Sequence, residues 1–277
     1  MNSAAGIRAP RWLVLLTAFG RQGLNRRLAY PAGYWMHLVN TLVKMFGVCT
    51  VWLVLYAVSP GNFPVPMANM VAYGVVSAVL GELLGWWDGP HFHIAKRVRT
   101  GLITGDLLRP MSLPYQLFCL WVGESLVVLG LVVLPATVVA AVAFDVAAPV
   151  SALAGVQFTI GVVLAFVLMF CLNFLVGMLV MRTMNLYGLM VVYHAVITIL
   201  SGVWIPLWLY PEWLADLTMW LPFRAVFFTP LSVYIGLVQD GEAWRDLGLQ
   251  ALWTVVGIGL ITLAWRGSHR RLVVQGG

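Results

Sequence analysis

The feature that most constrains this chain is a series of long apolar segments separated by short polar stretches. A helix needs about 20 mostly apolar residues to cross the roughly 30 Å hydrocarbon core of a membrane. Five segments reach that length and a sixth is slightly shorter. They predict an all-α integral membrane protein with six transmembrane helices, near Tyr34–Tyr56, Met67–Trp86, Leu117–Val142, Ser151–Val180, Leu186–Pro206 and Leu247–Trp265.

The composition supports the same fold class and a single membrane domain. Charged residues make up 9% of the chain and hydrophobic residues 61%, whereas soluble proteins carry about 25% charged residues. We therefore expect one six-span domain over residues 31–277, preceded by a cytoplasmic N-terminal part over residues 1–30. The cysteines each lie inside an apolar segment, which indicates neither a disulfide framework nor a zinc site: Cys49, Cys119 and Cys171.

The basic residues predict the orientation of the chain in the membrane. Six spans place both termini on one side, and most of the 16 lysines and arginines fall on that side. Because cytoplasmic loops are enriched in Lys and Arg, we assign both termini to the cytoplasm. The net charge of +6 then reflects membrane orientation, and we expect no nucleic-acid partner.

The N-terminal stretch "PRWLVLLTAFGRQGLNRRLAY", between Ala9 and Tyr30, predicts a helix. Its apolar residues fall on one helical face, which is typical of a helix lying in the cytoplasmic membrane interface with its arginines near anionic lipid headgroups. A simple basic anchor before the first span explains the same residues equally well.

The segment from Ser201 to Asp246 is too apolar for a solvated loop and too interrupted by prolines for a straight span. It predicts an outer hairpin over residues 206–245 that either re-enters the membrane or lies at its interface. Irregular backbone is tolerated at membrane depth only where protein or a cavity covers it. Either a lid over an outer exit or a belt of interfacial aromatic residues accounts for it. Its candidate residues are Trp208, Trp213, Pro222 and Arg224.

Four polar or ionisable residues lie within the predicted spans: Lys44, Glu82, Glu124 and His194. A charged side chain at the centre of a span costs roughly 2.5 to 3.5 kcal/mol, so each charge is expected to have a partner. Counting residues from the cytoplasmic end of each span places Lys44 and Glu124 at similar depths in the membrane. This favours an ion pair between Lys44 and Glu124 over one between Lys44 and Glu82. The pair forms either a polar element of a transport path or a structural ion pair. For His194 a hydrogen bond between helices is the default expectation.

The cytoplasmic loop over residues 88–114 gathers charge in a chain that is otherwise poor in it. Lys96, Arg97, Arg99, Asp106 and Arg109 accompany a short apolar edge that includes Ile94, and glycines and prolines divide the loop. The pattern predicts a short helix, a turn and a second brief helix outside the membrane. Either a soluble partner binds this surface, or the bases only set the orientation of the chain.

Catalytic and metal-binding motifs are weak in this sequence. Asp88, His91 and His93 could ligate a metal, but one H-x-H with a single carboxylate is a poor signal, and we expect no metal site. The sequence contains no G-x-S-x-G, no H-E-x-x-H and no G-x-x-x-x-G-K-[ST]. We therefore expect neither an enzyme nor an ATP-binding chain.

Four stretches, taken in order, give the chain a family likeness: "GLITGDLLRPMSLPYQ" (Gly101 to Gln116), "LSGVWIPLWLYPEWL" (Leu200 to Leu214), "LPFRAVFFTPLSVYIG" (Leu221 to Gly236) and "RRLVVQGG" (Arg270 to Gly277). Together they resemble an ABC-2 type transporter permease of the bacterial branch of that family. The resemblance covers nearly the whole chain.

This resemblance implies a coupling helix at about Ile94 to Arg109 that docks on a separate ABC-type ATPase, and an outer hairpin at about Pro206 to Ile235. It implies a second permease, either identical or related, beside this one in the bacterial inner membrane. ATP and Mg²⁺ would then bind the partner ATPase, with no cofactor on this chain. Most relatives export hydrophobic or amphipathic molecules.

Two further function classes remain open alongside this ABC-type exporter subunit. One is an ion-coupled secondary transporter or channel that uses Lys44, Glu82 and Glu124, which would depend on a proton gradient without an ATPase. The other is a membrane scaffold without transport activity, which an ATPase partner would argue against.

Overall fold

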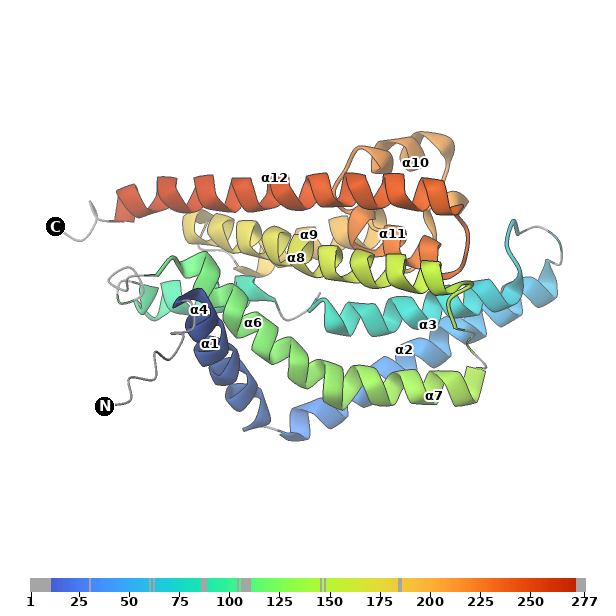
Figure 1. Cartoon of the computed structure of the whole chain (residues 1–277), viewed down its shortest axis with the longest axis horizontal. Coiled ribbons are helices and arrows are strands. Elements are labelled where there is room, and N and C mark those ends of the chain that lie inside the picture. Colours follow the sequence, from blue (N-terminus) through green and yellow to red (C-terminus); the bar gives the residue numbers. More distant parts are fainter. Residues whose placement is uncertain are drawn as a thin grey trace, which may run out of the picture.

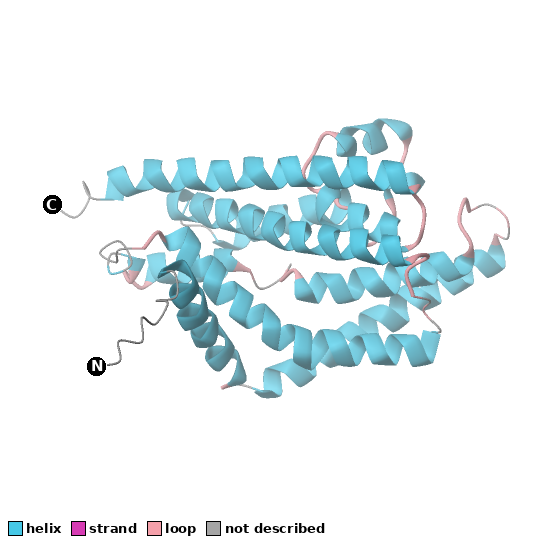
Figure 2. Ribbon diagram, viewed as in Figure 1, coloured by secondary structure: helices cyan, strands magenta, loops and turns pink. Residues whose placement is uncertain are grey.

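The computed structural model describes residues 11–29, 31–59, 61, 63–85, 89–103, 105, 111–144, 146, 148–183 and 186–272. Within these residues every regular element is a helix (Figures 1 and 2). The elements are α1 (Arg11–Leu28), α2 (Pro31–Val58), α3 (Met67–Leu83), α4 (Pro90–Arg99), α6 (Leu113–Val128), η1 (Leu129–Val133), α7 (Leu134–Phe144), α8 (Ala152–Thr183), α9 (Leu186–Leu200), η2 (Leu207–Leu209), α10 (Glu212–Met219), α11 (Arg224–Tyr234) and α12 (Asp240–Leu272).

Each of the six predicted apolar segments corresponds to a helix in this structure. Among the described residues, four helices are long and apolar enough to cross a membrane: Gly33–Val58, Leu113–Phe144, Ala152–Met181 and Asp240–Gly267. The other two predicted segments form shorter apolar helices, Met67–Leu83 and Tyr187–Leu200. The all-helical fold class is thus confirmed.

The long apolar helix Leu113–Phe144 contains one π turn, and a proline explains it. Pro135 is the second residue of α7, which directly follows the π turn η1. Proline has no backbone N–H, and its ring clashes with the carbonyl four residues earlier in a regular α-helix. The extra residue in a π turn absorbs this clash, so α6, η1 and α7 continue as one long helical element.

Helix α8 lies at the centre of the bundle and packs against α4, α11 and α12. Its buried side chains supply much of the largest hydrophobic core, including Leu168, Met169 and Phe174. The ring of Phe166 stacks on that of Trp121 from α6, with centroids 4.1 Å apart. A movement of any of these neighbouring helices therefore has to involve α8.

The segment after α9 folds onto the bundle, and its re-entry into the membrane stays a prediction. In α11, residues 225–233 are all buried, and the helix packs between α8, α12 and α3. The side chain of Gln250 from α12 donates to the carbonyls of Ala225 and Gly161, both at 2.8 Å. The preceding helix, α10, exposes Trp213, and Trp220, directly after its end, is also exposed.

The two ends of the bundle differ in which elements they carry. The start of α1, the short helix α4 and the end of α12 lie towards one end, while α10 lies towards the other (Figure 1). The same polarity is predicted from the sequence for the two sides of the membrane.

Candidate functional site

Helix α4 is a short basic helix with one buried edge. Proline at its first position starts the helix, and Lys96, Arg97 and Arg99 fall in its last turn, where cations interact favourably with the helix dipole. The buried residues recur at helical spacing on the other edge: His91, Ile94 and Ala95. Lys96 and Arg99 are exposed, so α4 presents charge outward and an apolar edge inward.

Small residues and one amide hold α4 tightly against α8. A Cβ atom added to Gly177 of α8 would lie 3.1 Å from the Cα of His91 and 3.2 Å from the Cβ of Ile94. Asn173, one turn earlier on α8, accepts a hydrogen bond from His91 Nδ1 at 2.9 Å and another from the hydroxyl of Tyr193 at 3.0 Å. Helix α4 is therefore fixed to α8 by backbone proximity and by a buried polar contact.

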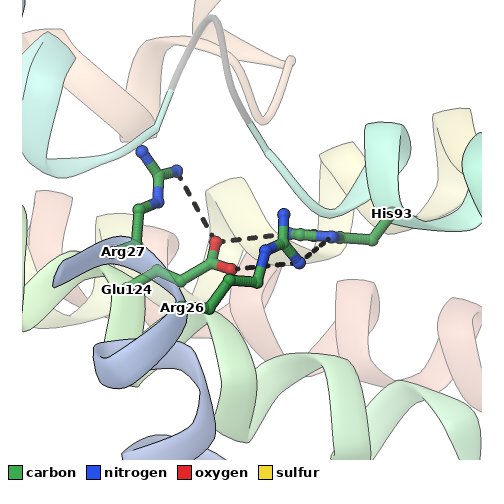
Figure 3. Close-up of polar contacts among 4 residues, drawn as sticks. All are labelled: Arg26, Arg27, His93 and Glu124. Atoms are coloured by element: carbon green, nitrogen blue, oxygen red, sulfur yellow. Dashed lines mark hydrogen bonds and ion pairs between the residues drawn. The ribbon is translucent and has the colours of Figure 1, made fainter. Parts of the chain in front are cut away.

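A buried charge cluster connects α4 with α1 and α6 (Figure 3). Glu124 of α6 is 1% exposed, and its carboxylate lies 3.5 Å from the guanidinium groups of both Arg26 and Arg27. His93 of α4 lies 3.2 Å from the same carboxylate through Nε2 and 3.1 Å from Arg26 through Nδ1. Because arginine can only donate, Nδ1 accepts and Nε2 carries the hydrogen that Glu124 receives.

Glycines allow α1 to pack directly on α6 beside this cluster. A Cβ atom on Gly123 of α6 would overlap the backbone of Gly20, and one on Gly23 would overlap the carbonyl of Leu120. The predicted N-terminal helix is confirmed, and its location in the membrane interface stays a prediction. These glycines were not predicted as a packing site from the sequence, although small residues at helix interfaces allow close backbone approach.

The predicted coupling residues do not all lie on one surface. Lys96 and Arg99 are exposed, and Arg97 is partly buried. Ile94 lies on the apolar edge that its spacing predicts, and its side chain is fully buried in the main core. Its part in coupling to an ATPase stays a prediction. Asp106 and Arg109 lie outside the described residues.

The prediction that Lys44 pairs with Glu124 was wrong. Lys44 Nζ donates to Glu82 Oε1 at 2.9 Å, and His37 Nδ1 lies 3.3 Å from the other oxygen of Glu82. The physical reason is lateral packing: α2 lies along α3, while Glu124 has partners on α1 and α4. Equal depth in two helices does not make them neighbours.

His194 is buried on α9, and its ring centroid lies 6.4 Å from that of His91. The two histidines considered for a metal have different partners, Asn173 for His91 and Glu124 for His93. Asp88 lies outside the described residues.

The predicted residues of the outer hairpin have different environments. Trp208 packs inward, with its ring edge-on to Tyr73 at 5.4 Å, whereas Trp213 is 69% exposed. Arg224 forms an ion pair with Asp246 at 2.9 Å and lies over the ring of Phe228. Pro222 is partly buried just before α11.

These features define a multi-pass helical membrane protein with a charged helix docked at one end of the bundle. The chain belongs to the ABC-2 family of transporters: the family model described as "ABC-2 family transporter protein" matches residues 38–276. No curated protein and no solved structure matches it. The predicted resemblance is thereby confirmed. Members of this family are membrane transport subunits that associate with ABC ATPase subunits.

Proposed function

We propose that this chain is the permease subunit of an ABC-type exporter that moves a hydrophobic or amphipathic molecule across the bacterial inner membrane. A separate ATPase subunit binds ATP and Mg²⁺ and supplies the energy. The observation that carries the proposal is α4, which exposes Lys96 and Arg99 and buries its other edge against α8. When a soluble partner displaces such a helix, the displacement is transmitted to α8 at the centre of the bundle.

The charge cluster extends this connection to a second helix. Glu124 contacts Arg26 and Arg27 of α1 and His93 of α4, so a displacement of α4 acts on α1 and α6 as well as on α8. In this proposal α1, α4 and α6 move together when the ATPase closes.

The proposal includes six spans with both termini in the cytoplasm and a second permease, identical or related, beside this one. Four long apolar helices and two shorter ones support the span number. Helices α3 and α9 are short for a membrane of normal thickness, and α11 adds buried helical structure against α3. Lipids and the second permease then cover the apolar side chains that α2 exposes, such as Met36 and Phe46.

An ion-coupled transporter is less well supported by the arrangement of charges. Glu82 belongs to a cluster with Lys44 and His37, whereas Glu124 belongs to one with arginines of α1. No residue is shared between these two clusters among the described contacts. A proton relay that uses both carboxylates would need such a connection.

The test replaces the two exposed bases of α4. We expect the double variant Lys96→Gln with Arg99→Gln to insert into the membrane normally. The ATPase activity that co-purifies with it in mild detergent should fall about tenfold or more, because the variant removes two charge-assisted contacts to the ATPase. The matched control is Arg21→Gln with Arg266→Gln, which removes two exposed bases from α1 and α12. Undiminished ATP-driven transport by the α4 variant would exclude coupling through this face, and transport that requires only a proton gradient would favour the ion-coupled alternative.

A further inference from the structure

A groove runs between α2, α3 and the segment 203–209. It consists of two adjoining cavities that share Lys44, Val48 and Trp204. The larger has a volume of about 640 Å³, and the smaller, about 20 Å³, extends it towards Gly74 and Gly81 of α3. A volume of this size falls within the range of small-molecule sites, roughly 300 to 1,000 Å³.

The wall of the groove is held in place by hydrogen bonds. The hydroxyl of Tyr73 donates to the backbone carbonyl of Gly202 at 2.6 Å, and the hydroxyl of Ser77 donates to the backbone carbonyl of Val203. Gly202 adopts a left-handed backbone conformation with φ of 74°, which favours glycine at this bend. The segment that carries Trp204 is therefore fixed onto α3 as one side of the groove.

Apart from one residue, the side chains that line the larger cavity are uncharged and mostly apolar, including Val51 and Leu55 of α2 opposite Ile205 and Leu209. The exception is Lys44, which lines both cavities. An elongated apolar wall with a single cation at one end is complementary to an amphipathic molecule with an anionic head.

The ammonium group of Lys44 has N–H donors that can bind such an anionic head. This group carries three N–H donors, and among the described contacts one of them reaches Glu82, at 2.9 Å. Glu82 is also held by His37 at 3.3 Å and lines neither cavity. The groove thus faces the cation of this ion pair, and the carboxylate lies behind it.

The depth of Lys44 distinguishes a molecule in transit from a lipid at rest. Lys44 is the fourteenth residue of α2, which has 28 residues, or about 20 Å along the helix axis from its start. The headgroup of a resident phospholipid lies at the membrane interface, whereas a head bound to Lys44 lies near the middle of the hydrocarbon core. A charged group is stable at that depth only with a partner.

We propose that this groove binds the transported molecule, and that this molecule is an amphipath with an anionic head and an apolar chain. The head contacts Lys44 Nζ, and the chain lies along Val51 and Leu55 against Trp204. This assignment rests on the proposed function and names its substrate class.

The experiment measures binding to the purified permease in detergent. The probes are a fluorescent polyene fatty acid and the alcohol of the same chain, which share a tail and differ in the charge of the head. We expect the carboxylate to bind about tenfold more tightly than the alcohol, since a charge-assisted hydrogen bond is stronger than a neutral one. Equal binding of the two probes would overturn the proposal.

Three variants connect this preference to the groove. Lys44→Met with Glu82→Gln removes both charges together, so no buried charge is left unpaired, and it should bind both probes alike. Lys44→Arg keeps the cation and should keep the preference. Val51→Trp fills the groove and should weaken both probes. A preference that survives in the doubly neutral variant would place the anion elsewhere and contradict the proposal.

Competition separates the two sources of an anionic amphipath. Excess phosphatidylglycerol or phosphatidylcholine should displace the fatty acid weakly and to the same extent. Strong displacement by phosphatidylglycerol alone would identify a resident anionic lipid and overturn the substrate assignment. Binding is measured without an ATPase, so the carboxylate preference can be present even if the chain proves not to be an exporter subunit. Conversely, a protein that shows ATP-driven transport but no carboxylate preference would contradict only the substrate assignment.

Discussion

At the scale of single residues, Glu124 shows how a carboxylate is kept inside a helical bundle. Its side chain is 1% exposed, and its two arginine partners differ in exposure, 16% for Arg27 and 55% for Arg26. Arg27 is the less hydrated of the two and so interacts more strongly with the carboxylate. His93 supplies a donor from α4. Glu124 therefore joins three elements through one buried group.

Removal of this charge should loosen all three elements. We expect Glu124→Gln to lower the free energy of unfolding by about 1 to 3 kcal/mol, because the donors around it lose a charged acceptor while the more exposed Arg26 regains hydration. The loss is measured as a lower melting temperature in detergent. Glu242→Gln, at an exposed position of α12, is the control and should melt like the wild type. A Glu124→Gln protein of unchanged melting temperature would show that the cluster contributes nothing to stability.

At the scale of elements, α1 and α4 each pack on a neighbouring helix through a glycine. In each case a glycine on a long helix lets the backbone of the short helix approach closely: Gly123 of α6 faces Gly20 of α1, and Gly177 of α8 faces His91 of α4. Close backbone approach increases van der Waals contact where the apolar solvent offers little hydrophobic driving force. Such contacts suit short helices, which have few side chains to bury.

The contact between α1 and α6 can be tested with one methyl group. Gly123→Ala would push its Cβ into the backbone of Gly20, so α1 has to move away, at a cost of about 1 to 3 kcal/mol. We expect faster tryptic cleavage at the arginines of α1, measured by mass spectrometry of the fragments. Gly259→Ala in α12, where a Cβ meets nothing within 4 Å, should leave the cleavage rate unchanged. Equal rates in both variants would contradict the close packing of α1.

At the scale of the whole molecule, basic and acidic residues are unevenly distributed over the helices. Helix α4 and the last turn of α1 are basic, whereas exposed acidic residues lie on α10 and at the start of α12, among them Glu212, Asp216 and Glu242. The positive-inside rule applied to these bases gives the orientation that we propose.

The orientation is tested by labelling from outside intact cells. Single cysteines at Arg99 and at Glu212, both exposed positions, are introduced after the three buried native cysteines are replaced. We expect an impermeant maleimide to label the cysteine at 212 at once and the one at 99 only after the membrane is permeabilised. Immediate labelling at both positions would exclude the proposed topology.

Much of the fold follows from patterns along the chain. The apolar segments predict the six apolar helices, since hydrophobicity and length are properties of each segment alone. Proline positions predict that the segment from Ser201 to Asp246 does not form one straight span, and the family likeness appears in four stretches of sequence. The basic loop predicts α4 because charge next to a short apolar edge is also a local property.

The contacts between helices were decided only by the tertiary structure. Counting residues gives the depth of Lys44 and Glu124, but depth does not say which helices are lateral neighbours, so the true partner of Lys44 is Glu82 on α3. The burial of Ile94 likewise depends on α8 lying beneath α4. Periodicity along a segment reports which residues share a face, and only the packing of the whole chain determines whether that face meets water, lipid or another helix.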